Sequence, residues 1–199
     1  MDVTFEPVEH RYFVDGVEKP SVSTILSLFA DYSRVPRATL EAKRLLGRAV
    51  HKAIELYEAG TLDPESIDPL WEPYFEGWIR LKGDMPFKVF AAEEIVYSKR
   101  FGYCGRLDLN AELEGARWQI DVKCVDAMSP ATALQTAGYA EAWNEMHPDM
   151  KITKRAGVQL RPDGSYRLYA YNAPEHRTDL NIFLNAVAIR NWLANKGML

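Results

Sequence analysis

The sequence of 199 residues has little cysteine, no long apolar run and no excess of basic charge. Its two cysteines, Cys104 and Cys124, are too few for a disulfide framework or a four-thiolate metal site. No apolar run approaches the roughly 20 residues that cross a bilayer, and residues 1–6 lack the basic and then apolar pattern of a secretory signal. These absences predict a cytoplasmic protein without membrane association.

The formal net charge of −4 does not favour a nucleic-acid partner, because phosphate binding usually leaves a basic footprint. Basic residues nevertheless gather over residues 34–52 and 151–155. Each group is most simply a solvated face, so charge alone does not predict binding to DNA. Apolar residues make up 47% of the chain and aromatic residues 12%, which is enough for a packed core.

The order of apolar and turn-forming residues predicts a mixed α/β protein with a central β-sheet flanked by helices. Apolar residues recur at helical spacing over 37–59, and Gly60 ends that run. Asp15-Gly16 predicts a hairpin turn after residues 10–14. Further helices are expected over 21–30, 64–81, 130–146 and 175–195, and strands over 87–97, 103–112, 117–124, 158–161 and 166–171. Pro69 and Pro73 could break the helix over 64–81. No repeat or linker divides the chain, so we expect one domain over residues 1–199.

Two aspartates and a lysine lie on a predicted hairpin of two strands. If Glu114-Gly115 is a two-residue turn, the pairing that follows from it places Asp108 directly opposite Asp121. Their Cβ atoms would then be about 5 Å apart. Like charges at that distance are unfavourable unless a proton or a cation is shared between them. Lys123 follows Asp121 by two residues and shares its face of the strand.

Hard oxygen ligands of this kind favour Mg²⁺ or Mn²⁺. The alternative is a solvated face on which Asp121 pairs with Lys123 and Arg106. The geometry also depends on the turn, because a shift of one residue would put the two carboxylates on opposite faces. On the other face of the hairpin, we expect an apolar set that comprises Leu107, Leu109, Ile120 and Val122.

An acidic residue followed by Asp-x-Lys on the next strand resembles the PD-(D/E)XK nuclease superfamily, with Leu107-Asp108 in place of Pro-Asp. The sequence is most similar to the RecB-like exonuclease branch, whose five motifs have counterparts here in the same order. They are Gly47-x-x-x-His51, Glu93, Gly105-x-x-Asp108, Asp121-x-Lys123 and Gln135-x-x-x-Tyr139. Residues 10–13 and 20–26 also resemble the lead-in of phage-encoded members, so the similarity covers roughly residues 10–145.

The resemblance implies a restriction-endonuclease-like core over about 87–199 plus helix 37–59, preceded by a lead-in over about 1–86. It implies DNA as the substrate, and a single-strand annealing or recombination protein as a partner. One or two Mg²⁺ or Mn²⁺ ions would be held by His51, Asp108, Asp121 and the carbonyl of Val122. The implied catalytic residues are Lys123, Asp121, Asp108, Glu93, Gln135 and Tyr139. Relatives with an iron–sulfur cluster are excluded, because they need four cysteines.

Several of these residues also have a structural interpretation. Gly47 shares a helical face with His51, and we expect it to let another backbone approach closely. A lone helix histidine such as His51 is more often a surface or core residue than a metal ligand. Glu93 and Glu94 are adjacent on a strand, so only one can face the site; the resemblance favours Glu93. Gln135 and Tyr139 share a helical face and could be a simple surface pair. The aromatic residues that could stack on bases are more simply explained as core, and these are Trp71, Tyr74, Phe75 and Trp78.

The sequence therefore predicts a metal-dependent DNA exonuclease. One alternative is a non-catalytic DNA-binding or assembly protein that keeps the fold, and another is an unrelated metal hydrolase that acts on a small phosphoester. Strand polarity, the choice between single and double strands, exonuclease or endonuclease action and the oligomeric state are not predicted.

Overall fold

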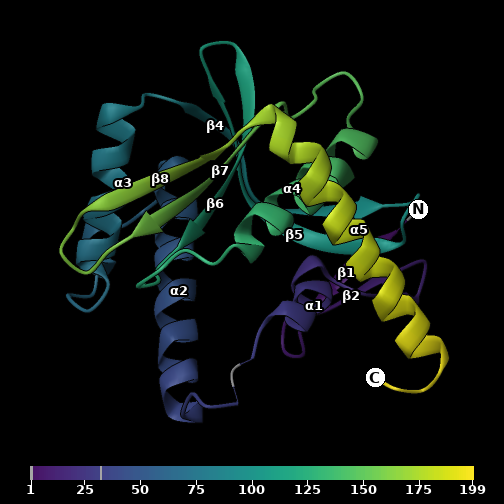
Figure 1. Cartoon of the computed structure of the whole chain (residues 1–199). Helices are drawn as coiled ribbons and strands as arrows, with labels where there is room; N and C mark the ends of the chain where they lie inside the picture. The colour runs from purple at the N-terminus through teal and green to yellow at the C-terminus, as the bar shows by residue number, and fades with distance from the viewer. Residues whose placement is uncertain (1, 32) are drawn as a thin grey trace.

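The computed structural model describes residues 2–31 and 33–199. Near the N-terminus, β1 (Val3–Glu6), β2 (Arg11–Val14) and β3 (Val17–Lys19) form a small antiparallel sheet (Figure 1). The predicted turn at Asp15-Gly16 joins β2 and β3, with φ of 48° and 77°. Strand β1 was not predicted from the sequence.

The second sheet is mixed, as predicted, and has five strands in the order β4-β5-β6-β7-β8. Its β6 and β7 are parallel, and every other neighbouring pair is antiparallel. The parallel pair needs a crossover connection, which helix α4 (Ala131–Met146) supplies. The strand bounds are Lys88–Ser98 for β4, Tyr103–Leu113 for β5, Ala116–Lys123 for β6, Lys154–Leu160 for β7 and Tyr166–Tyr171 for β8.

The remaining helices are α1 (Val22–Leu26), α2 (Arg37–Glu58), α3 (Glu72–Asp84) and α5 (Ala173–Asn195). Two predicted helices were too long. The helix expected over 21–30 changes after Leu26 to a 3₁₀ turn over Ser27–Phe29. The helix expected over 64–81 is divided into a 3₁₀ turn over Pro64–Ser66 and α3, because proline is accepted in a first helical turn but not in a helix interior.

The turn between β5 and β6 has the predicted geometry. Glu114 and Gly115 have φ of 53° and 74°, as a two-residue hairpin turn requires. Pairing runs from Leu113 opposite Ala116 to Leu109 opposite Ile120, which confirms the predicted register. The ladder ends at this last pair, one residue before Asp108 and Asp121. The two strands therefore separate at the point where the acidic residues lie.

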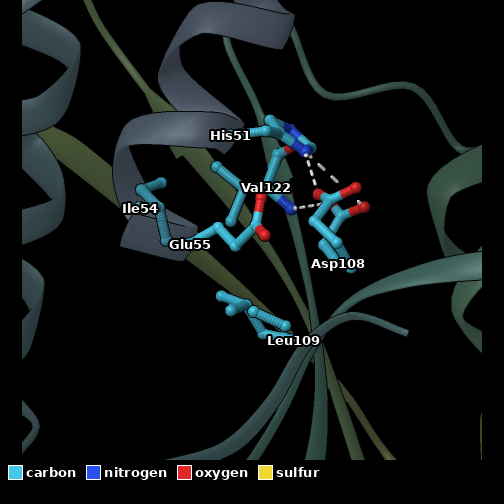
Figure 2. A pocket seen from close by; sticks show the side chains of 8 residues that line it. His51, Ile54, Glu55, Asp108, Leu109 and Val122 are labelled. Atoms are coloured by element: carbon cyan, nitrogen blue, oxygen red, sulfur yellow. Dashed lines mark hydrogen bonds and ion pairs between the residues drawn. The ribbon is translucent and has the colours of Figure 1, made fainter. Parts of the chain in front are cut away.

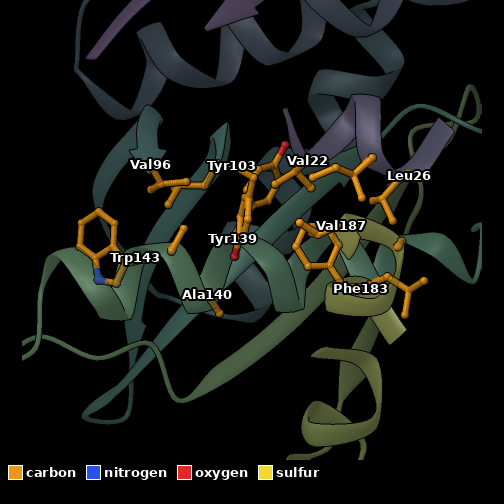
Figure 3. Close-up of a cluster of buried hydrophobic side chains, with 14 of the residues drawn as sticks. Val22, Leu26, Val96, Tyr103, Tyr139, Ala140, Trp143, Phe183 and Val187 are labelled. Carbon is orange, nitrogen blue, oxygen red and sulfur yellow. The ribbon is translucent and has the colours of Figure 1, made fainter. Parts of the chain in front are cut away.

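Helices cover the sheet in two layers, each with its own core. Helices α2 and α3 pack over Leu109, Ile120 and Val122. Helices α1, α4 and α5 form a second cluster with Tyr103 and Leu107 (Figure 3). The prediction that Leu107 shares an apolar face with the other three residues was wrong. Leu107 packs in the cluster of α1, α4 and α5, whereas Leu109 packs in the cluster of α2 and α3.

Helix α2 is buried over its C-terminal half alone, through Val50, Ala53 and Ile54. Its N-terminal half leaves the body of the protein and is exposed. The aromatic side chains of α3 are core residues, as the structural interpretation expected, since Tyr74, Phe75 and Trp78 are buried. In the part of the chain that the structure describes, no helix combines the length and apolar character needed to cross a bilayer.

Candidate metal-binding and catalytic site

Three side chains from different elements converge where β5 leaves β6. They are His51 of α2, Glu93 of β4 and Asp108 of β5, and one ligand atom from each lies within 4.8 Å of the others. His51 Nδ1 is 3.1 Å from Glu93 Oε1 and 3.8 Å from Asp108 Oδ1. The fold thus brings together residues that are 42 and 57 positions apart along the chain.

Glu93, and not Glu94, joins this cluster. Its φ of 54° lies in the left-handed region, which a non-glycine residue occupies at a cost of about 1–3 kcal/mol. The residue lies between the paired positions Ala92 and Glu94, opposite Asp108. Arg106 holds its second carboxylate oxygen, with Nε 2.8 Å from Oε2. Strained backbone of this kind is concentrated at functional sites.

The backbone of Val122 connects His51 to Asp108. Its N–H donates to Asp108 Oδ2 at 2.7 Å, and its carbonyl accepts from His51 Nε2 at 2.9 Å (Figure 2). The first contact replaces the sheet hydrogen bond that is lost where the strands separate. The carbonyl that the resemblance implies as a metal ligand therefore lies beside the histidine.

The cluster favours a positive charge at its centre. Burial alone would lower the pKa of His51, but the carboxylates of Asp108 and Glu93 outweigh it and raise the pKa to about 9. As an imidazolium, His51 donates from both ring nitrogens to Glu93 and Val122. A metal ion that bound His51 would replace one of these protons.

Asp121 forms an ion pair with the partly exposed Lys123 beside this cluster. Asp121 is 0% exposed, and its Oδ2 lies 2.6 Å from Lys123 Nζ. Neither carboxylate oxygen makes a well-aligned hydrogen bond within the described residues. Burial raises the pKa of Asp121 to about 7, against the opposing charge of Lys123 and with the help of Asp108. The solvated-face interpretation is therefore wrong, and Arg106 pairs with Glu93 instead of Asp121.

The side chains fit a divalent cation. A cavity of about 10 Å³ lies among His51, Glu93 and Asp108, which is room for one water-sized body. The donors are the imidazole of His51 and the carboxylates of Glu93 and Asp108. The predicted ligand Asp121 does not line this cavity, and its buried carboxylate contacts Lys123 without a well-aligned hydrogen bond. Oxygen-rich sites suit Mg²⁺ and Mn²⁺, and a nitrogen donor shifts the preference toward Mn²⁺.

Two of the sequence motifs touch each other. A Cβ atom on Gly105 would lie 2.5 Å from Cε1 of Tyr139, so only glycine fits against this ring. The hydroxyl of Tyr139 accepts from Gln135 Nε2 at 3.3 Å. Burial, followed by the charge of Asp108, raises the pKa of Tyr139 well above its ordinary value. Tyr139 is therefore a buried neighbour of the acidic cluster, and it is not on the helix surface.

Gly47 does not have the role that we expected. We interpreted this glycine as allowing another backbone to approach, but a Cβ atom there would meet no atom within 4 Å. Gly47 instead lines a cavity of about 450 Å³ that also contacts His51 and Lys123.

Sequence reasoning assigned no role in the site to Arg106. The signal was present, because Arg106 precedes Asp108 by two residues and so shares its face of β5. Its partner Glu93 could not be identified, because the pairing depends on the left-handed backbone of that residue.

No protein-family model matches the chain, and a comparison with curated proteins found no match. Among solved structures, the chain is similar to a candidate exonuclease from Eubacterium rectale, with 16% identity and a TM-score of 0.58 over 91% of this chain and 82% of that one. An alkaline exonuclease from Laribacter hongkongensis also matches, with 14% identity and a TM-score of 0.36 over 90% of this chain and 93% of that one. The first likeness shows that the two proteins share a fold.

Proposed function

We propose that this protein is a metal-dependent deoxyribonuclease that degrades DNA as an exonuclease. The observation that carries the proposal is the buried carboxylate of Asp121, which pairs with Lys123 beside the cluster of His51, Glu93 and Asp108. Burying the charged groups of this site lowers the stability of the folded protein. A role in catalysis explains why they are nevertheless present. The shared fold with the Eubacterium rectale candidate exonuclease supports the same class of reaction.

His51, Asp108, Asp121 and the carbonyl of Val122 would hold one or two Mg²⁺ or Mn²⁺ ions. Bound there, a divalent ion supplies charge stabilisation at the phosphoryl group and lowers the pKa of a water molecule. Glu93 orients His51 through their 3.1 Å contact. Gln135 and Tyr139, which contact each other at 3.3 Å, would contact the DNA backbone or steady the catalytic residues.

Lys123 offers a fixed positive charge beside the reacting phosphate. Burial opposes its charged form, but Asp121 and Asp108 outweigh burial and raise its pKa. Lys123 therefore keeps its proton, and its ammonium group donates a hydrogen bond that can orient the attacking water. It also offsets the negative charge that builds on the phosphoryl oxygens.

The test is cleavage of DNA by purified Lys123→Ala and Asp121→Asn variants with Mg²⁺ or Mn²⁺. We expect each variant to lose at least about 100-fold in rate, as is typical when a group that acts in the transition state is removed. End-labelled linear DNA should be degraded by the wild type and closed circular DNA should not. Lys82→Ala is a matched control, since Lys82 forms a comparable partly buried pair with Glu58 at 2.9 Å, away from the site.

Three outcomes would contradict the proposal. Full activity in either site variant would remove these residues from the chemistry. DNA binding without cleavage under any metal would favour the non-catalytic alternative. Hydrolysis of a small phosphodiester without any action on DNA would favour the unrelated hydrolase.

A further inference from the structure

Two cavities meet at Lys123. The first, here called the α2 cavity, has a volume of about 450 Å³ and lies along the exposed half of α2. The second, the α4 cavity, has a volume of about 460 Å³ and lies between the Ser27–Phe29 turn and the start of α4. Arg44, Lys123 and Val125 line both. A molecule that crosses this junction passes directly over Lys123 and its pair with Asp121.

The α4 cavity combines an apolar wall with positive charge. Leu26, Phe29 and Val125 form the wall, and Arg44 and Lys123 supply the cations. No carboxylate is among the described residues that line it. Hydroxyl and amide groups complete the lining, from Ser23, Ser27, Ser129, Thr132 and Gln135.

A nucleotide has the matching chemistry, with an apolar base face, polar base edges and an anionic phosphate. The volume also falls in the range of small-ligand sites. Phe29 is 52% exposed although it is large and apolar, so its ring is available for stacking. Exposed aromatic rings beside cations are the usual means of binding single strands without sequence preference.

We propose that the α4 cavity binds one unpaired nucleotide adjacent to the bond that is cut, with its base stacked on Phe29 and its phosphate at Arg44. This assignment rests on the proposed nuclease function and names its substrate as DNA that is single-stranded at the site. In an intact duplex the base faces are stacked on each other and phosphates face outward. The apolar wall of the α4 cavity would therefore have no exposed base face to contact on a duplex.

The α2 cavity takes the next nucleotide on the other side of Lys123. Gly47 leaves this space open, since a Cβ atom there meets nothing within 4 Å. Lys43 lies in the same cavity, and its exposed pair with Asp126 at 3.7 Å is weak, so a phosphate can replace that partner. The strand then follows a path from Lys43 past Arg44 and Lys123 to Phe29.

The first test measures binding of a fluorescent oligothymidylate in EDTA, so that cleavage does not interfere. Phe29→Ala should weaken binding about tenfold, the loss expected for one stacked base, and Phe29→Trp should restore it. Leu28→Ala is the matched control, because Leu28 is an exposed apolar residue of the same turn that does not line the cavity. A closed hairpin duplex should compete poorly with the oligothymidylate.

The second test measures how binding depends on salt. Arg44→Ala should reduce the slope of log affinity against log salt by about 0.7, the value for one phosphate contact on a single strand. Arg80→Ala is its control, since Arg80 is also an exposed helix arginine with a glutamate neighbour, in α3. Equal slopes for the two variants would remove Arg44 from the path of the strand.

The assignment would be overturned if Phe29→Ala bound like the wild type, or if the duplex competed as well as the single strand. These results are independent of the test of function. Loss of cleavage in Lys123→Ala with unchanged binding by Phe29→Ala would leave a nuclease whose substrate lies elsewhere. Full cleavage by Lys123→Ala with weakened binding by Phe29→Ala would keep the single-strand site but remove Lys123 from the chemistry.

Discussion

At the scale of single residues, Glu93 has an unfavourable backbone conformation within the candidate site. Its left-handed backbone is unfavourable for a glutamate, and the contacts of its carboxylate offset that cost. Arg106 binds one oxygen at 2.8 Å and His51 the other at 3.1 Å. Phe5 of the N-terminal sheet lies under the guanidinium at 5.1 Å, so Arg106 is held from both sides. Arg106 is therefore a positioning residue for Glu93.

We expect Arg106→Ala to lower activity about 10- to 100-fold, the usual effect of losing a residue that orients a metal ligand or its neighbour. The metal concentration for half-maximal activity should rise, because Glu93 no longer holds His51 in place. Arg106→Lys should recover part of the loss. The measurement is initial rate against Mn²⁺ concentration.

Arg167→Ala serves as the control for this prediction. Arg167 is a strand arginine that also lies over an aromatic ring, that of Tyr169, but it belongs to the edge strand β8, three strands from Asp108 on β5. If Arg106→Ala shifted the metal dependence no more than Arg167→Ala, the positioning role would be wrong.

At the scale of helices and strands, two glycines of the sequence motifs have opposite surroundings. Gly105 of β5 lies against the ring of Tyr139 from α4, and a Cβ atom would overlap that ring. Gly47 of α2 faces open space in the α2 cavity. The first glycine therefore allows a strand and a helix to pack closely, and the second leaves room for a ligand.

Alanine at these two positions should consequently have effects of opposite sign on stability. Gly105→Ala should reduce the free energy of unfolding by about 1–3 kcal/mol, as overpacking of a core does. Gly47→Ala should increase it by about 0.5–1 kcal/mol, because alanine favours a helix interior more than glycine does. Urea denaturation of the metal-free variants measures both. Equal destabilisation by the two substitutions would contradict these surroundings.

The same elements show how far the sequence could predict the structure. The register of β5 and β6 was predictable because a Glu-Gly turn fixes it locally. The point at which the strands separate was not, since it depends on Asp108 replacing a sheet hydrogen bond to Val122. Leu107 was also assigned to the wrong apolar cluster. Alternation along a strand predicts its two faces, but not which helices cover each end of a twisted hairpin.

The residues that gather at the candidate site were easier to predict from the sequence than the contacts between them. The order of the motifs pointed to Glu93 and Tyr139, and the structure places both near Asp108. The function of Gly47 was misjudged, because spacing along a helix does not reveal whether a neighbour or a cavity faces it. The partner of Arg106 depended on the backbone of Glu93, which no local pattern predicts.

At the scale of the whole molecule, the N-terminal region is tied to the core. Val22 and Leu26 of α1 belong to the same buried cluster as Phe183 and Val187 of α5 (Figure 3). Ser21 forms a bridge with Cys104 at the start of β5. We therefore propose that residues 1–86 and the core fold as one cooperative unit, with a single unfolding transition.

We expect the stability of this unit to depend on metal ions bound at the acidic cluster. The carboxylates of Glu93 and Asp108 lie close together at His51, and Asp121 is fully buried beside them. The metal-free protein therefore bears electrostatic and desolvation costs that a divalent cation would relieve. Ligands that bind the native state stabilise it by mass action, by about 2.7 kcal/mol at 100 times the dissociation constant. For a chain of this length, that corresponds to a rise in Tm of about 5–11 °C.

Calorimetry or a dye-based melt with and without Mn²⁺ measures this rise. Asp108→Asn should abolish it, because it removes one carboxylate charge from the cluster. Asp163→Asn is the control, since Asp163 is an exposed turn residue that bonds to Ser165 and should keep the full response to Mn²⁺. An equal rise in Tm for both variants would mean that the ion binds elsewhere on the protein, and that the cluster of His51, Glu93 and Asp108 is not the metal site.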